Sequence, residues 1–178
     1  MHLATAGGIF FDIGTMAIVL WFPAKSLVGL LNSFFASITV CMEVRMNTLT
    51  PELFLALYQS VGWEPPCIEQ VRTALKNTIA TFTCYDGDRP VGMVRVIGDG
   101  GMSFYIKDFA VVPAYQGKGI GKQLMRALEQ FVKECKPLDW AVSLELISSK
   151  EAVNFYKKYG FEERPCDWDG PGMFKMIR

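Results

Sequence analysis

A short glycine-rich turn is the part of the sequence best suited to chemistry. It follows the apolar pair Val111 and Val112 and contains Gln116, Gly117, Lys118, Gly119, Gly121 and Lys122. A strand that turns through glycines into a helix directs several backbone N–H groups at one point, where the helix dipole is positive. Glycine also adopts positive φ and lets a ligand approach the backbone closely. The turn therefore predicts an anion-binding site.

Two common phosphate-binding loops do not fit this turn. A Walker A loop needs Ser or Thr after Gly-Lys, and Gln123 stands there; a Rossmann fingerprint needs a third glycine that is missing. What remains is Gln-x-x-Gly-x-Gly at Gln116, Gly119 and Gly121. This pattern is similar to the acetyl-CoA pyrophosphate loop of the GCN5-related N-acetyltransferases (GNATs). The alternative interpretation is a plain strand-to-helix turn with extra glycines.

A second segment carries the same resemblance. Residues 141–147 alternate and are rich in Leu and Val, which is typical of a strand. Ser148 and Ser149 are N-cap candidates for a following helix, and Gly160 is its expected C-cap. The stretch from Asn154 to Phe161 resembles the closing helix of the GNAT family. The resemblance covers about residues 42–178 and implies a GNAT acetyltransferase domain there.

The expected elements are placed by caps, periodicity and turn residues. Helices are predicted over 51–61, 68–76 and 119–133, with strands over 42–45, 78–85, 90–97, 103–112, 141–147 and 173–177. The order is strand, two helices, three strands, helix, strand, helix and two strands. This is an α/β (α+β) layout with helices on both faces of a mixed, mostly antiparallel central sheet.

The resemblance also implies which residues hold the cofactor. The pantetheine arm of acetyl-CoA would lie beside the strand ending at Val111 and Val112 and pair with their backbone groups. Lys118 and Lys122 are either charge partners of the phosphates or part of a solvated face. Asn154 either hydrogen-bonds the pantetheine amides or lies on the surface, because Ser149 stands where many relatives carry an asparagine.

Two catalytic roles follow from the same resemblance. Tyr156, in the pair Phe155-Tyr156, is the expected general acid for the departing CoA sulfur, with Tyr159 as its rival and simple packing as the alternative. A phenol suits this role because its ordinary pKa is about 10. Glu145 is the expected base that deprotonates the amine, with Asp108 as a second candidate. Either carboxylate is also consistent with a structural or solvated group.

The acceptor is expected to contact the first two helices and the last strands. Tyr58, Trp63, Glu64, Trp168 and Phe174 would give aromatic walls and an acid that suit a small cationic amine. The leading hypothesis is acetyl transfer to a small-molecule amine. Acetylation of a protein N-terminus or lysine, a non-catalytic acyl-CoA-binding module and a membrane-tethered interaction protein are the alternatives.

Composition narrows the remaining classes. The formal net charge is zero, which disfavours nucleic-acid binding. Five scattered cysteines without a CxxC pair indicate reduced thiols in a cytoplasmic protein. The single histidine, His2, argues against a metal site and a Ser-His-Asp triad, so no metal is predicted. A homodimer remains open.

The first 41 residues differ from the rest of the chain. They carry only two formal charges, Asp12 and Lys25, and the run from Ser26 to Met42 is uncharged and mostly apolar. That run is at the short limit for a membrane span. Three interpretations stay open: translation starting at Met42 with residues 1–41 as an upstream extension, a membrane-associating segment, or helices packed on the domain or a partner.

Overall fold

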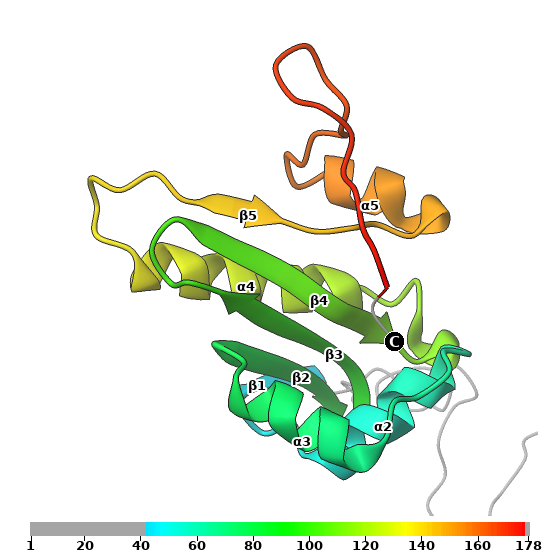
Figure 1. Ribbon diagram of the computed structural model, residues 1–178. Helices are drawn as coiled ribbons and strands as arrows, with labels where there is room; N and C mark the ends of the chain where they lie inside the picture. Colours follow the sequence, from blue (N-terminus) through cyan, green and yellow to red (C-terminus); the bar gives the residue numbers. More distant parts are fainter. Residues whose placement is uncertain (1–41, 177–178) are drawn as a thin grey trace, which may run out of the picture. The chain divides into compact units, whose positions relative to one another are not determined.

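The sheet is the frame on which the candidate site is built. A computed structural model describes residues 42–176, and the expectations for residues 1–41 lie outside that range. Five strands pair in sequence order (Figure 1): β1 (Met42–Met46), β2 (Ala80–Asp86), β3 (Arg89–Gly98), β4 (Ser103–Val111) and β5 (Ser143–Glu145). The first three pairings are antiparallel and the last, β4 with β5, is parallel. The predicted mixed, mostly antiparallel sheet is confirmed.

The turn between β3 and β4 shows why the chain reverses where it does. The Asp99 carboxylate accepts hydrogen bonds from the backbone N–H groups of Gly101, Met102 and Ser103 at 2.9–3.0 Å. Gly98 has a φ of +147°, and a Cβ there would lie 2.1 Å from the carbonyl oxygen of Ser103. Only glycine fits at this position, so the sequence fixes the turn and with it the start of β4.

Two helices cover one face of the sheet. α2 (Pro51–Ser60) begins at Thr50, whose hydroxyl accepts the N–H of Leu53 at 3.2 Å, as the predicted N-cap should. α3 (Ile68–Lys76) follows after the two prolines. Both helices lie on the same side of the sheet in Figure 1. Their buried side chains form one cluster with residues of β3 and β4: Leu49, Phe54, Leu57, Val71, Met93 and Ala110.

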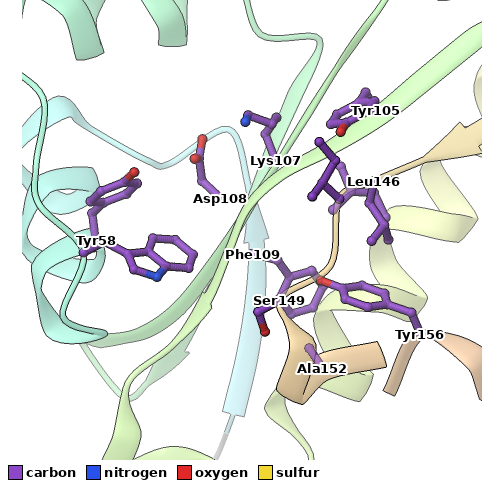
Figure 2. A pocket seen from close by; sticks show the side chains of 12 residues that line it. Tyr58, Tyr105, Lys107, Asp108, Phe109, Leu146, Ser149, Ala152 and Tyr156 are labelled. Carbon is purple, nitrogen blue, oxygen red and sulfur yellow. The ribbon is translucent and has the colours of Figure 1, made fainter. Parts of the chain in front are cut away.

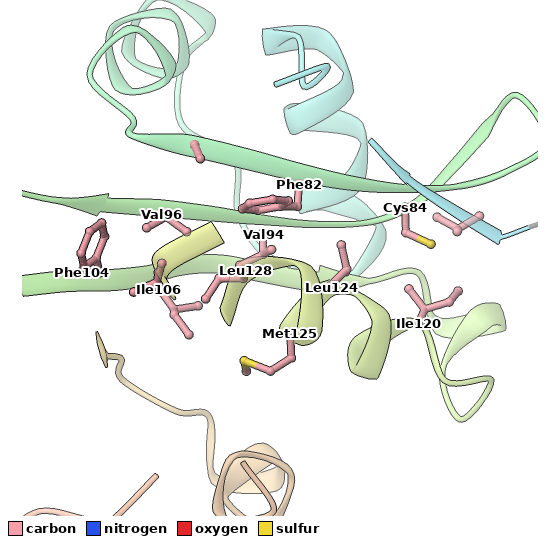
Figure 3. Packing of buried hydrophobic residues seen from close by; sticks show 13 residues of the cluster. Phe82, Cys84, Val94, Val96, Phe104, Ile106, Ile120, Leu124, Met125 and Leu128 are labelled. Atoms are coloured by element: carbon pink, nitrogen blue, oxygen red, sulfur yellow. The ribbon is translucent and has the colours of Figure 1, made fainter. Parts of the chain in front are cut away.

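The opposite face is covered by α4 (Ile120–Cys135). Its apolar stripe is placed against β2, β3 and β4, and Figure 3 shows Leu124 and Leu128 on the side of α4 that faces Val94 and Val96. Burial of such a stripe is the main source of helix stability in a globular domain. The predicted helix is confirmed, with Ile120 and Val132 as further buried positions. Helices therefore lie on both faces of the sheet, as expected.

β4 and β5 part soon after they meet. Their pairing covers only Ser103 with Ser143, Phe104 with Leu144 and Tyr105 with Glu145. β4 then continues to Val111. The segment after β5 leaves the sheet and leads through η2 (Lys150–Ala152) into α5 (Val153–Lys157). The strand is thus shorter than the predicted 141–147. The divergence leaves one side of β4 without a strand partner over its second half.

The expectation of two strands after the last helix is wrong for the described residues. Residues 162–176 contain only an isolated bridge between Cys166 and Asp169. A strand needs a partner, and β5 offers only three paired residues at the edge of the sheet. Met173, Phe174 and Met176, which lie in the predicted strand 173–177, are 91%, 82% and 72% exposed.

Candidate active site

The glycine-rich turn forms a continuous run of unpaired backbone donors. After η1 (Pro113–Tyr115), Gly117 and Gly119 adopt left-handed φ values of +73° and +84°, and α4 begins directly after Gly119. The first intrahelical bond runs from the N–H of Gln123 to the carbonyl of Gly119 at 3.1 Å. The six N–H groups of residues 117–122 have no hydrogen-bond acceptor in the part of the chain that the structure describes. Such a run at a positive helix end suits a polyanion.

Gln116 holds this turn against the end of β4. Its side-chain amide Nε2 donates to the carbonyl oxygen of Val111 at 3.0 Å. Val112 is fully engaged within the protein, because its N–H donates to Val91 at 2.9 Å and its carbonyl accepts from Tyr115 at 2.8 Å. Backbone groups alternate in direction along an antiparallel strand, so the N–H of Val111 points away from β3, toward the open side of β4. Only Val111 of the predicted pair keeps a backbone donor for a ligand.

The remaining loop residues have different surroundings. Gly121 lies under the ring of Phe155, and a Cβ at this position would lie 3.3 Å from that ring. The exposed side chain of Lys118 places its Nζ 4.9 Å from the centre of the Tyr115 ring. Lys122 is exposed as well. Close packing against Phe155 therefore favours glycine at position 121, in addition to the backbone donor that the sequence suggested.

A cavity of about 300 Å³ lies where β4 and β5 diverge. Figure 2 shows Tyr58 and Asp108 on one side of it and Tyr156 and Ala152 on the other, with Phe109 between them. Trp63, Leu146 and Ser149 also line it. The walls therefore come from α2 and the loop after it, from β4, from the segment between β5 and α5, and from α5 itself. Residues nearly 100 positions apart in the sequence meet here.

Tyr156 occupies the α5 side of the cavity. Its ring packs edge-to-face against Phe109, Phe155 and Phe161, with centroids 5.2–6.2 Å apart. Burial raises the pKa of its phenol to about 12. The hydroxyl points toward the middle of the cavity and has no hydrogen-bond partner within residues 42–176. The predicted rival, Tyr159, does not line the cavity.

Asp108 sits on a bulge of β4. The register between β3 and β4 shifts between Met93 and Arg95, and Asp108 has a left-handed φ of +51°. One carboxylate oxygen, Oδ2, accepts from Nε of Arg95 at 2.6 Å. The other has no hydrogen-bond partner among the described residues. Burial, and next the charge of Asp108, raise the pKa of the neighbouring Tyr58, while Arg95 acts in the opposite direction.

Glu145 lies in a separate network at the paired end of β4 and β5. Its Oε1 accepts from the hydroxyls of Ser143 and Ser103 at 2.9 and 3.4 Å, and its Oε2 lies 3.5 Å from Nη1 of Arg164. Glu145 is not among the residues that line the cavity, although its neighbour Leu146 is. After burial, its charge is the second cause that raises the pKa of Tyr105. The structure therefore brings Asp108, and not Glu145, to the cavity with Tyr156.

Of the other site residues predicted from the sequence, some line the cavity and the rest are exposed on the surface. Tyr58 and Trp63 line the cavity, whereas Glu64 and Asn154 are exposed and do not. Trp168 and Phe174 are exposed too. Arg95 was not predicted as a site residue. A signal was present, because Arg95 interrupts the apolar run of β3, and a charge in a buried strand is usually paired.

Comparison with known proteins shows the class of enzyme to which this fold belongs. A family model for the acetyltransferase (GNAT) domain matches residues 56–173. This chain belongs to the GNAT family of acetyltransferases, and the predicted resemblance is confirmed. The match runs from within α2 through the glycine-rich turn to the segment after α5.

Individual proteins agree with this assignment. An uncharacterized N-acetyltransferase, ycf52, from Pyropia yezoensis is 32% identical over 123 residues, covering 66% of this chain and 67% of that protein. The solved structure of a GNAT-family acetyltransferase from Streptococcus pneumoniae aligns with a TM-score of 0.65 and 32% identity, covering 77% of this chain and 98% of that one.

A further relative bears on the cellular compartment. A chloroplastic GCN5-related N-acetyltransferase 2 from Arabidopsis thaliana is 29% identical over 129 residues, covering 61% of this chain and 48% of that protein. The expected cytoplasmic location therefore stays a prediction. Within residues 42–176, no helix is both long enough and apolar enough to cross a membrane.

Proposed function

We propose that this acetyltransferase moves the acetyl group of acetyl-CoA to the primary amine of a small molecule, with Tyr156 as general acid. The observation that carries the proposal is the joint presence of six N–H groups at the start of α4 and of a phenol in the cavity, none of which has a hydrogen-bond partner within residues 42–176. The first feature suits a diphosphate and the second suits the reacting end of a thioester.

The cofactor-binding residues fit acetyl-CoA. The diphosphate would accept hydrogen bonds from the amides of Gly117, Lys118, Gly119 and Gly121, with the ammonium groups of Lys118 and Lys122 nearby in solvent. The pantetheine arm would run along the open side of β4 and pair with the backbone of Val111. Asn154 is exposed at the start of α5 and would make a weaker contact with the pantetheine arm.

The chemistry needs one proton acceptor and one proton donor. The acceptor arrives as an ammonium ion and loses a proton to a carboxylate, directly or through water. The neutral amine attacks the thioester carbonyl, and β4 N–H groups on the open side would stabilise the oxyanion. The C–S bond then breaks, Tyr156 gives its proton to the sulfur, and the new amide nitrogen loses a proton that restores the phenol. One proton is released for each acetyl group transferred.

We assign the proton acceptor to Asp108 in preference to Glu145. Asp108 lines the cavity opposite Tyr156, and one of its carboxylate oxygens has no partner among the described residues. Glu145 has its oxygens engaged by Ser143, Ser103 and Arg164 outside the cavity. Glu145 remains the alternative, and a variant of each residue separates the two.

A small acceptor is supported by the dimensions of the cavity. Its volume of about 300 Å³ is at the low end for ligand pockets, and Tyr58 and Trp63 close one side of it. A protein N-terminus or a lysine side chain could enter only as a narrow chain end. The family itself does not decide between these acceptors.

The test is an assay of the full-length chain with acetyl-CoA and a panel of small amines and short peptides, with detection of free CoA. Turnover of at least one small amine, with peptides slower in kcat/KM, is expected. Faster turnover of peptides would replace the small-molecule acceptor by a protein one. Tight binding of acetyl-CoA with no turnover of any acceptor would favour a non-catalytic acyl-CoA-binding module.

A further inference from the structure

Arg95 stands apart from the other charged residues of the domain. It is the one charged residue counted as buried within residues 42–176, with 8% of its surface exposed. A guanidinium group loses favourable hydration on burial, and good geometry with several partners is needed to offset that loss. The burial of Arg95 therefore has to be explained by the partners of its guanidinium group.

The guanidinium group of Arg95 contacts four different segments. Nε donates to Oδ2 of Asp108 at 2.6 Å, and Nη1 donates to the hydroxyl of Thr78 at 2.7 Å and to the carbonyl of Ala74 in α3 at 3.3 Å. The Cζ atom lies 5.6 Å from the centre of the Phe54 ring in α2. A planar group fastened on several sides has little freedom to rotate. Its shortest hydrogen bond goes to the cavity carboxylate.

The carboxylate of Asp108 depends on this support. Asp108 lies on a bulge with left-handed φ, where strand pairing does not by itself fix the direction of the side chain. Arg95 holds one oxygen, and the other has no partner in the part of the chain that the structure describes. The side chain of Asp108 is only 12% exposed, so its free oxygen cannot find an alternative direction in bulk solvent without the bulge moving.

We propose that Arg95 is a positioning residue for acetyl transfer, which aims the free carboxylate oxygen of Asp108 at the acceptor amine and couples that aim to α2 and α3. This inference rests on the proposed function, in which Asp108 accepts the proton of the amine. Arg95 itself touches no reacting atom. A purely structural role for Arg95 predicts loss of stability alone, whereas a positioning role predicts a defect that disappears when Asp108 is already disabled.

The test is a double-mutant cycle between Arg95→Lys and Asp108→Asn in the full-length chain, with kcat and KM measured for the amine and for acetyl-CoA. Arg95→Lys keeps the positive charge but loses the planar fork. We expect it to lower kcat/KM for the amine about tenfold while the KM for acetyl-CoA changes less than about twofold. In the Asp108→Asn background, Arg95→Lys should cause no further loss. Independent, multiplicative losses would overturn the inference.

Two further variants protect this test against a folding defect. Thr78→Val removes one support of Arg95 without touching the ion pair, and it should lower kcat/KM for the amine about threefold, in the same direction. Arg72→Lys alters an exposed arginine that pairs with Glu52 at 3.3 Å between α2 and α3, and should leave kcat unchanged. Melting temperatures of all variants separate stability from activity.

The two proposals fail in different ways. If the wild-type protein releases no CoA with any acceptor, the proposed function is wrong and the Arg95 inference is wrong with it. If the wild-type protein turns over an amine but Thr78→Val and Arg95→Lys lower only the melting temperature, the function stands and Arg95 is structural.

Discussion

The two halves of the candidate site are built in opposite ways. The glycine-rich turn is local, because residues 116–122 are consecutive and offer backbone N–H groups. The acceptor side is assembled from side chains of α2, β3, β4 and α5, such as Tyr58, Arg95, Asp108 and Tyr156. A backbone site depends on φ angles, whereas a side-chain site depends on packing between distant segments. Substitutions in the turn should therefore act through backbone strain, and substitutions in the cavity through the positions of side chains.

The largest effect is expected in the turn. Gly119→Glu forces a side chain onto a φ of +84° and places a negative charge beside the donors that would face a diphosphate. Left-handed φ costs roughly 1–2 kcal/mol, and with charge repulsion we expect Kd for acetyl-CoA to rise about 1,000-fold. Calorimetry measures this. Gly119→Ala, which adds the strain without the charge, is the matched control, and equal binding by Gly119→Glu and wild type would contradict the loop assignment.

The next effect belongs to the proton donor. Tyr156→Phe keeps the aromatic packing but removes the hydroxyl, so kcat should fall about 100-fold with Kd for acetyl-CoA unchanged. Tyr159→Phe, at a tyrosine of the same segment that does not line the cavity, is the control. Unchanged turnover in Tyr156→Phe would remove this residue from the mechanism.

The pH dependence offers a separate check on Tyr156. Burial raises the pKa of its phenol to about 12, and the donor is active while protonated. Its activity is therefore complete at lower pH and is lost only as the pH rises through about 12. Near pH 10, the pH profiles of kcat for the wild type and for Tyr156→Phe should therefore have the same shape, with no fall in activity that only the wild type shows. A limb at that pH, abolished by the substitution, would mean that the phenol is solvated in the complex.

The two carboxylates are expected to differ. Asp108→Asn removes a charged hydrogen-bond acceptor worth roughly 2 kcal/mol, so kcat/KM for the amine should fall about 30-fold. Glu145→Gln keeps one carbonyl acceptor for the hydroxyl groups of Ser143 and Ser103, and its loss of kcat/KM should be at least about tenfold smaller. Steady-state kinetics of both variants measures the difference. The reverse order would return the role of base to Glu145.

The smallest effect is expected where the turn packs against α5. Gly121→Ala gains helix propensity but places a Cβ 3.3 Å from the Phe155 ring, next to Tyr156. Overpacking usually costs about 1–3 kcal/mol and the propensity gain is about 1, so a net loss of roughly 1 kcal/mol is expected. Thermal unfolding measures it. A gain in stability would show that the Phe155 ring yields freely, and that the spacing between the turn and α5 is not tight.

The same contrast decides what could be predicted from the sequence. The Thr50 cap, α4 and the left-handed Gly160 follow from local signals, and all three are present. The position of Asp108 in the cavity depends on a bulge whose register is set by pairing with β3, and no local pattern encodes that shift. The same holds for the three-residue length of β5 and for the absence of a strand at residues 173–176.

A sheet whose last two strands part after three rungs has an unpaired edge in its interior, not only at its border. A folded partner is too thick to enter between two strands, so this edge is protected from the aggregation that threatens ordinary edges. A thin, linear molecule that carries amide groups can enter and extend the ladder. In the proposed complex, the narrow gap would admit the thin pantetheine arm of acetyl-CoA and exclude a folded protein, and the arm would pair with β4 as a further strand would.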